Sequence, residues 1–264
     1  MENRLTRLFK EKKENLLNVY FTAGFPELES TGHILKTLEQ AGADLVELGM
    51  PYSDPMADGP TIQESNTVAL KNGMSIRKLL QQVEAARTEV SLPIILMGYL
   101  NPVMQFGVER FCEAAARAGV DGLILPDLPL LDYEEVYRPV FEKHNLSVIF
   151  LITPQTSEER IRKIDLLTDS FIYVVSSAST TGKNVGGEAR QIQYFERIQR
   201  MELKSPKLIG FGISDRASFE MACRYAQGAI IGSAFIKVIA QKEELTSRIQ
   251  QYIREVKASE AVAS

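Results

Sequence analysis

The chain has 264 residues, of which 45% are hydrophobic, so it has enough apolar material for one large core or two small ones. Its net charge of -4 argues against nucleic acid or an anionic membrane surface as the main partner. The two cysteines fall in helical patterns and are expected to be reduced thiols of a cytoplasmic protein. The two histidines are isolated, which argues against a metal site, and neither a signal peptide nor a membrane span is expected.

The first predicted element is an amphipathic helix at 3–13, within an N-terminal segment 1–14, with Leu5, Leu8 and Phe9 on one face. Short apolar strands then alternate with helical patterns. The predicted strands are Leu16–Thr22, Asp44–Leu48, Pro93–Met97, Gly122–Leu125, Ser147–Ile152, Phe171–Val175, Lys207–Phe211 and Ala229–Ile231. The predicted helices are 28–41, 61–70, 75–89, 106–118, 132–144, 157–167, 189–201, 215–226 and 243–257.

This alternation gives eight strand–helix units at a period of about thirty residues. Parallel strands need such helical crossovers, and eight of them close naturally into a (β/α)8 TIM barrel, here with an extra N-terminal helix. A doubly wound open sheet is the alternative, but no G-x-G-x-x-G follows the first strand. We find no linker, so a single domain over 1–264 is predicted, with a frayed tail at 258–264.

The second strand carries the residue that most needs an explanation. Glu47 interrupts the apolar run of Leu45, Val46 and Leu48, and burying an unpaired carboxylate costs several kcal/mol or raises its pKa. The strand ends at Gly49 and opens into a stiff, acidic loop that contains Asp54 and Asp58. A buried structural ion pair is the alternative reading of Glu47, and a turn or helix cap is the alternative for the two aspartates.

In a barrel, the carboxyl ends of the strands and the loops after them form the active face. Asp127 follows the fourth strand, where it could simply brace its loop, and Tyr173 lies in the sixth. The small, polar, Gly-rich loop from Ser176 to Gly187 has the composition of a mobile lid or of a solvated surface loop. Phe21 and Ile124 are most simply core residues, although at strand ends they could wall an apolar part of a ligand site.

The last two units carry a second signal. The segments Gly210-Phe-Gly212-Ile-Ser214 and Gly228-Ala-Ile-Ile-Gly232-Ser233 end strands seven and eight. Glycines let a backbone approach an anion, and barrels frequently hold phosphate at these two loops. The residues therefore predict a barrel enzyme with carboxylate acid–base chemistry and a phosphorylated substrate.

One stretch closely resembles the signature of the tryptophan synthase alpha subunit family, namely Leu45-Val-Glu47-Leu-Gly49-Met-Pro-Tyr-Ser-Asp54-Pro-Met-Ala-Asp58-Gly59-Pro-Thr-Ile-Gln63. The resemblance covers nearly the whole chain. It includes Phe21-Thr-Ala-Gly24-Phe-Pro26, Met97-Gly-Tyr-Leu-Asn101-Pro, Asp127-Leu-Pro129, Thr181-Gly182, Gly210-Phe-Gly212-Ile-Ser214 and Gly232-Ser233-Ala.

The resemblance implies a lyase that cleaves indole-3-glycerol phosphate to indole and D-glyceraldehyde 3-phosphate without a cofactor. Glu47 and Asp58 match the catalytic glutamate and aspartate of the family, and Tyr173 matches its site tyrosine. Phe21 and Ile124 would flank the indole, and Thr181 would meet Asp58 when the loops close. The implied phosphate donors are Gly182, Gly212, Gly232 and Ser233.

The resemblance also implies a pyridoxal-phosphate beta subunit as partner, in a complex of two alpha and two beta subunits that makes tryptophan. Pro51, Asp54, Asn101 and Pro129 match the docking surface. A lyase that works alone and releases free indole, or a non-catalytic subunit that only activates the beta chain, are the alternatives. The sequence departs from the family at Ser177 and Ser179, where an arginine and a glycine are usual, and this bears on closure of the loop and coupling to the partner.

Overall fold

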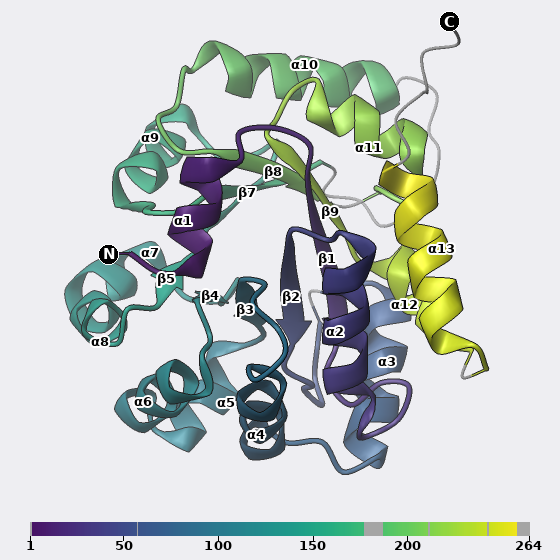
Figure 1. The fold of residues 1–264 in the computed structure, drawn as a ribbon. Helices are drawn as coiled ribbons and strands as arrows, with labels where there is room; N and C mark the ends of the chain where they lie inside the picture. The colour runs from purple at the N-terminus through teal and green to yellow at the C-terminus, as the bar shows by residue number, and fades with distance from the viewer. Residues whose placement is uncertain (1, 57, 177–186, 211, 242, 258–264) are drawn as a thin grey trace, which may run out of the picture.

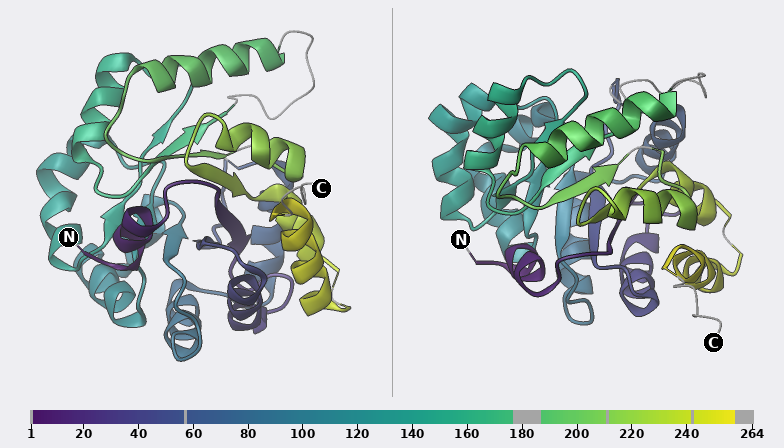
Figure 2. Two further views of the ribbon diagram at one scale, coloured as in Figure 1. Left: turned by 45° about the horizontal axis from the view of Figure 1, so that its top comes forward. Right: turned by 90° about the horizontal axis from the view of Figure 1, so that it is seen from above.

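The computed structural model describes residues 2–56, 58–176, 187–210, 212–241 and 243–257. Nine parallel strand segments form one sheet in the order β5-β4-β3-β2-β1-β9-β8-β7-β6, and helices surround it (Figures 1 and 2). The segments are β1 Leu16–Thr22, β2 Leu45–Gly49, β3 Ile94–Met97, β4 Gly122–Ile124, β5 Ser147–Val148, β6 Leu151–Ile152, β7 Ile172–Val175, β8 Lys207–Gly210 and β9 Gly228–Ile231.

The two ends of this sheet, β5 and β6, are halves of the one strand predicted at Ser147–Ile152. The Ile149 N–H donates to the Leu123 carbonyl on the β4 side at 3.0 Å. The next residue turns to the other neighbour, because the Phe150 carbonyl accepts a bond from the Tyr173 N–H on the β7 side, also at 3.0 Å. The chain itself therefore joins the ends of the sheet, and the predicted (β/α)8 barrel is confirmed.

The helices follow the predicted pattern with two refinements. The helix predicted at 106–118 begins at Val108, and Gly107, with φ of 91°, separates it from an additional helix at Leu100–Phe106, where Pro102 is tolerated in the first turn. A π-helical turn, η1, interrupts the segment predicted at 132–144. The helices are α1 Arg4–Glu11, α2 Ser30–Ala41, α3 Pro60–Lys71, α4 Ile76–Ala86, α5 Leu100–Phe106, α6 Val108–Ala118, α7 Leu130–Asp132, η1 Tyr133–Tyr137, α8 Arg138–Lys143, α9 Glu158–Leu167, α10 Gly187–Arg200, α11 Arg216–Cys223, α12 Ser233–Ile239 and α13 Leu245–Lys257.

Two apolar layers hold the barrel together. One lies between the strands and the surrounding helices. The other fills the barrel interior, where Ile95, Ile124 and Leu208 pack with Leu5 and Phe9 of α1. The ring of Phe9 lies 5.3 Å from that of Phe171, so α1 closes the amino-terminal end of the barrel. Because strand side chains alternate, each strand contributes every second residue to the interior.

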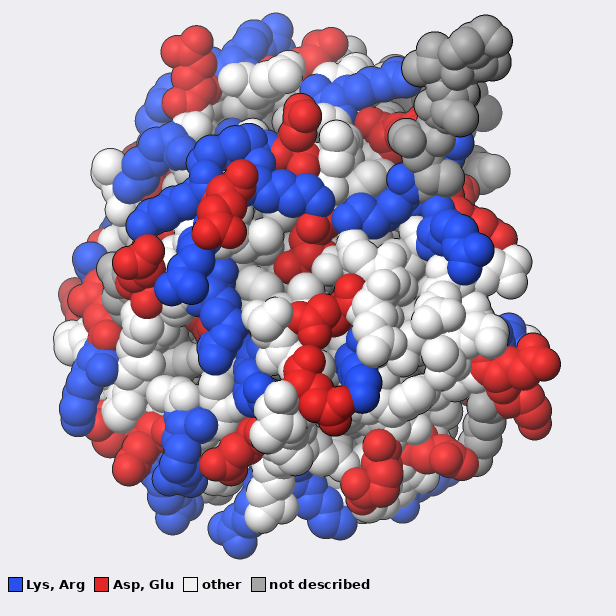
Figure 3. Space-filling model, in the orientation of Figure 1, with Lys and Arg blue, Asp and Glu red and all other residues white. Residues whose placement is uncertain are grey.

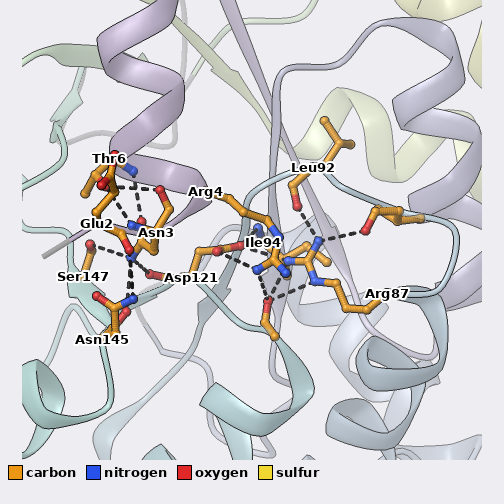
Figure 4. Close-up of polar contacts among 12 residues, drawn as sticks. Glu2, Asn3, Arg4, Thr6, Arg87, Leu92, Ile94, Asp121, Asn145 and Ser147 are labelled. Carbon is orange, nitrogen blue, oxygen red and sulfur yellow. Dashed lines mark hydrogen bonds and ion pairs between the residues drawn. The ribbon is translucent and has the colours of Figure 1, made fainter.

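A buried ion-pair network fastens α1 to the barrel (Figure 4). The Asp121 carboxylate, 1% exposed, pairs with Arg4 at 3.1 Å and with Arg87 at 2.9 Å, and it also accepts a bond from the Ile94 N–H. Asn3, the N-cap of α1, donates to the Asp121 carbonyl at 2.9 Å. One aspartate thus connects α1, α4 and the start of β3 just before β4 begins.

Charges elsewhere on the surface are mixed. Figure 3 shows acidic and basic side chains interspersed over the face in the orientation of Figure 1. Among the described residues, no helix is long and apolar enough to cross a membrane.

Replacing Asp121 with asparagine tests the network. Asp121→Asn keeps an acceptor for the Ile94 N–H but leaves the buried Arg87 cation without its counter-charge, which should lower the free energy of unfolding by about 3 kcal/mol. Urea denaturation measures this change. The control is Glu89→Gln, which removes the partner of Lys36 in an exposed ion pair and should cost less than about 1 kcal/mol. Equal losses in the two variants would contradict the assigned role of Asp121.

Candidate active site

The side chain of Glu47 points into the barrel from the middle of β2. It is fully buried and lies beside Ile95 on β3 and Tyr20 on β1, its register partners. The Asn18 amide donates to Glu47 Oε1 at 2.6 Å, while no hydrogen bond to Oε2 is recorded among the described residues. Burial raises the pKa of Glu47 to about 8, against the opposing effect of the Asn18 bond. Glu47 is therefore mostly protonated at neutral pH and can donate a proton.

The second carboxyl group, Asp58, lies in the loop after β2, directly before α3. Its backbone is tied down, because the Asp58 N–H donates to the Pro55 carbonyl and the Gln63 amide donates to the Asp58 carbonyl. The Tyr99 hydroxyl lies 3.4 Å from Asp58 Oδ2. Burial raises the pKa of Asp58 to about 6, with the Tyr99 bond acting in the opposite direction. At neutral pH, Glu47 is therefore mostly protonated and Asp58 mostly ionised, the combination that acid–base chemistry requires.

Two interior tyrosines share this space. Burial raises the pKa of Tyr173, and the charges of Glu47 and Asp58 raise it further. Burial and the same two carboxylates also raise the pKa of Tyr20. Both tyrosines therefore lie within electrostatic range of both carboxyl groups. Ile124 packs in the same interior layer as Tyr173.

Glycines at two strand ends make room for these rings. A Cβ on Gly49 would lie 2.4 Å from the Tyr20 hydroxyl, and a Cβ on Gly210 would lie 2.3 Å from the Tyr173 hydroxyl. Any larger residue at either position would push a tyrosine out of the site.

The prediction for Phe21 is wrong. Phe21 faces the helix layer, where its ring lies edge-on to that of Phe235 at 6.3 Å. Tyr20 and Asn18 occupy the inward positions instead, because alternate residues of a strand point to opposite sides. One residue in the sequence does indicate which side of this strand faces inward. Asn18 is polar, although the strand is buried along its whole length.

The predicted phosphate-binding residues lie at the ends of two neighbouring strands. Gly212, with φ of 78°, follows β8, and Gly232 follows β9 as the N-cap of α12. Ser233 is the first residue of that helix and is exposed. Thr181 and Gly182 lie outside the described residues, as do Ser177 and Ser179. A separate hollow of about 350 Å³, lined among others by Arg77, Phe106 and Arg110, lies on the outer faces of α4 and α6 and is not part of this site.

The predicted partner-binding residues all follow neighbouring strands of the barrel. Pro51 and Asp54 come after β2, Asn101 after β3 and Pro129 after β4; all but the half-buried Pro51 are exposed. Three large apolar side chains on the same loops and helix starts are also exposed, namely Met56 at 86%, Met104 at 52% and Leu131 at 57%.

Asp127 has a structural role. Its two carboxylate oxygens accept bonds from the Leu100 N–H at 2.9 and 3.0 Å, so it caps α5 and braces the loop, as one reading of the sequence allowed. No group of His, Cys, Asp and Glu suited to a metal ion occurs among the residues that the structure describes.

Comparisons with known proteins bear on the family and the fold of this chain. The sequence profile of the family described as "Tryptophan synthase alpha chain" matches residues 6–263. The chain belongs to this family. The tryptophan synthase alpha chain of Parabacteroides distasonis is 51% identical over 97% of this chain and 99% of the relative, and that of Flavobacterium johnsoniae is 51% identical over 97% and 100%.

Solved structures of the family have the same fold. The tryptophan synthase subunit alpha of Legionella pneumophila superposes with a TM-score of 0.88 at 32% identity, covering 97% of each chain. A chain from a tryptophan synthase structure of M. tuberculosis superposes with a TM-score of 0.84 at 29% identity, covering 97% of this chain and 98% of that one. As a member of this family, the chain is a lyase of tryptophan biosynthesis.

Replacing Glu47 with glutamine should stabilise the protein while removing its acid. The pKa of Glu47 is about 8 in the folded state and near 4.5 when unfolded, so the folded state holds the proton more tightly and wild-type stability falls as pH rises between those values. Glutamine carries no such penalty, so Glu47→Gln should gain on the order of 3 kcal/mol at pH 7 and little below pH 4.5.

Denaturant unfolding across this pH range measures the gain. The control, Glu84→Gln on the exposed side of α4, should change stability by less than about 0.5 kcal/mol at every pH. A Glu47→Gln variant that is less stable than wild type at pH 8 would refute the account of the buried acid.

Proposed function

We propose that this chain cleaves indole-3-glycerol phosphate to indole and D-glyceraldehyde 3-phosphate by a retro-aldol reaction that needs no cofactor in this chain. The observation that carries the proposal is the pair of carboxyl groups on β2 and in the loop that follows it. Glu47 with a pKa of about 8 is an acid at neutral pH, and Asp58 with a pKa of about 6 is an anion. The family assignment supplies the substrate.

In the proposed reaction, Glu47 first gives its proton to C3 of the indole ring, and positive charge then appears at the ring nitrogen. Asp58 accepts a hydrogen bond from the ring N–H and stabilises that charge. The Glu47 carboxylate then takes the proton of the hydroxyl beside the ring. The carbon–carbon bond breaks, its electron pair returns to the ring, and indole and the aldehyde leave. Tyr173 positions the glycerol chain or Glu47 itself.

The remaining predicted contacts complete the site. Gly182, Gly212, Gly232 and Ser233 would hold the phosphate, Ile124 would flank the indole, and Thr181 would meet Asp58. The positive φ of Gly212 and the exposed start of α12 are consistent with free N–H groups for an anion.

We further propose a cytoplasmic complex of two of these chains with two beta subunits that carry pyridoxal phosphate and receive the indole. Pro51, Asp54, Asn101 and Pro129 would form the docking surface, a role that the exposed Met56 beside them supports. One closed sheet that draws strands from residue 16 to residue 231 supports a single domain.

Release of indole from indole-3-glycerol phosphate, with and without a beta subunit, tests the function. We expect slow release by the purified chain alone and a large increase with the partner. The chain contains no tryptophan, so indole fluorescence would stand on a low background. Fast release that ignores the partner would favour a lyase that works alone. No release in either condition would leave an activating subunit and overturn the role of Glu47.

The pH dependence of kcat/KM tests the two carboxyl roles separately. Activity should be highest between about pH 6 and about pH 8. It should fall on the acid side as Asp58 gains a proton, and on the alkaline side as Glu47 loses the proton that it must donate. The Asp58→Asn variant should have a much lower kcat/KM, and its pH profile should lack the fall on the acid side. A rate that keeps rising above pH 8 would exclude Glu47 as the first acid.

A further inference from the structure

Tyr20 is an interior residue that the reaction described above does not use. It is 7% exposed and faces the barrel interior beside Glu47, its register partner on β2. Its hydroxyl makes one recorded contact among the described residues, to Thr22 Oγ1, at 3.5 Å. This is long for a bond between two hydroxyl groups, so the hydrogen-bonding capacity of Tyr20 is largely unused.

The direction of that contact follows from its neighbours. The Ser65 hydroxyl donates its only proton to the Ile62 carbonyl at 2.8 Å. With the Ser65 proton on that carbonyl, Thr22 is the donor to the Ser65 oxygen, which lies 2.6 Å away. Thr22 can then only accept from Tyr20. This chain of hydroxyl groups, which starts in α3, leaves the lone pairs of the Tyr20 oxygen without a donor among the described residues.

The place of Tyr20 indicates which donor could reach it. Its hydroxyl lies over Gly49, at the end of the strand that carries Glu47. The base of its ring lies near Gly232, since a Cβ on that glycine would be 3.6 Å from the Tyr20 ring. A substrate with its indole at the carboxyl groups and its phosphate at Gly232 must cross Tyr20 with its middle part, the glycerol chain.

We propose that the Tyr20 hydroxyl accepts a hydrogen bond from a hydroxyl group of the glycerol chain, and that the Thr22–Ser65 pair orients Tyr20 for this contact. The inference rests on the proposed function and deepens it, because it assigns a specificity-determining contact for the hydroxylated middle of the substrate. Tyr20 is here a substrate-binding residue, and Thr22 and Ser65 are positioning residues that act through it.

Tyr20→Phe keeps the ring and removes the acceptor. We expect kcat/KM for indole-3-glycerol phosphate to fall about fivefold. The inhibition constant of indole-3-propanol phosphate, in which hydrogens replace both glycerol hydroxyls, should stay within twofold of its wild-type value. Unchanged inhibition also shows that the variant is folded with its site intact. A variant that weakens both ligands equally, or neither, would overturn the inference.

Ser65→Ala tests the orientation. Without Ser65, the Thr22 proton is free to turn to the Tyr20 oxygen and occupy its lone pair, so kcat/KM should again fall severalfold. In the Tyr20→Phe background, Ser65→Ala should have no further effect, and additive losses would exclude action through Tyr20. The matched control is Thr67→Ala on the same helix, which removes an exposed hydroxyl that bonds to the Gln63 carbonyl and should leave kcat/KM unchanged.

The wild-type chain separates this inference from the proposed function. If wild type cleaves indole-3-glycerol phosphate and binds the propanol analogue, the proposed function stands, and an unselective effect of Tyr20→Phe overturns the Tyr20 contact alone. If wild type does neither, the proposed function fails and the contact fails with it.

Discussion

The burial of one carboxyl group inside the barrel is the constraint on which the site depends. The interior around Glu47 is otherwise mostly apolar, and a single amide, that of Asn18, satisfies one of its two oxygens. The barrel tolerates this group at neutral pH because it is mostly protonated, and the same condition makes it useful as an acid. In the proposed reaction, stability and catalysis therefore place opposite demands on this one residue, as is common at active sites.

Much of the fold could be predicted from the sequence because buried parallel strands and their helices leave a strong apolar pattern. Glu47 was visible for the same reason, as a polar residue inside such a run. It was harder to predict which residues of the first strand face the barrel interior, because a strand buried on both sides is apolar at almost every position. Phe21 and Tyr20 are both aromatic, and only the polar Asn18, two residues earlier, marks the inward side. The approach of Tyr99 to Asp58 depends on how two loops fold, which no local pattern encodes.

The glycines at the strand ends have more than one role. Gly210 stood within a segment predicted to bind phosphate, yet its own lack of a side chain makes room for Tyr173, as Gly49 does for Tyr20. Each tyrosine lies across the end of the neighbouring strand, so the active face is built from pairs of one large and one absent side chain. Even a change to alanine at these glycines would displace a tyrosine hydroxyl, although the glycines themselves contact no reacting group.

The switch of partners between Ile149 and Phe150 divides the barrel wall into two arcs. One arc, β1 to β5, carries both carboxyl groups, and the other, β6 to β9, carries Tyr173 and the glycines after β8 and β9. At the switch, each half-strand is hydrogen-bonded to a neighbour on one side, whereas the β1–β9 junction on the far side is paired over four residues. Opening the wall at the switch would therefore break fewer ladder hydrogen bonds than opening it at the β1–β9 junction. The covalent chain at the switch and the ladder at the β1–β9 junction therefore together set the span between the arc that carries the two carboxyl groups and the arc that carries Tyr173.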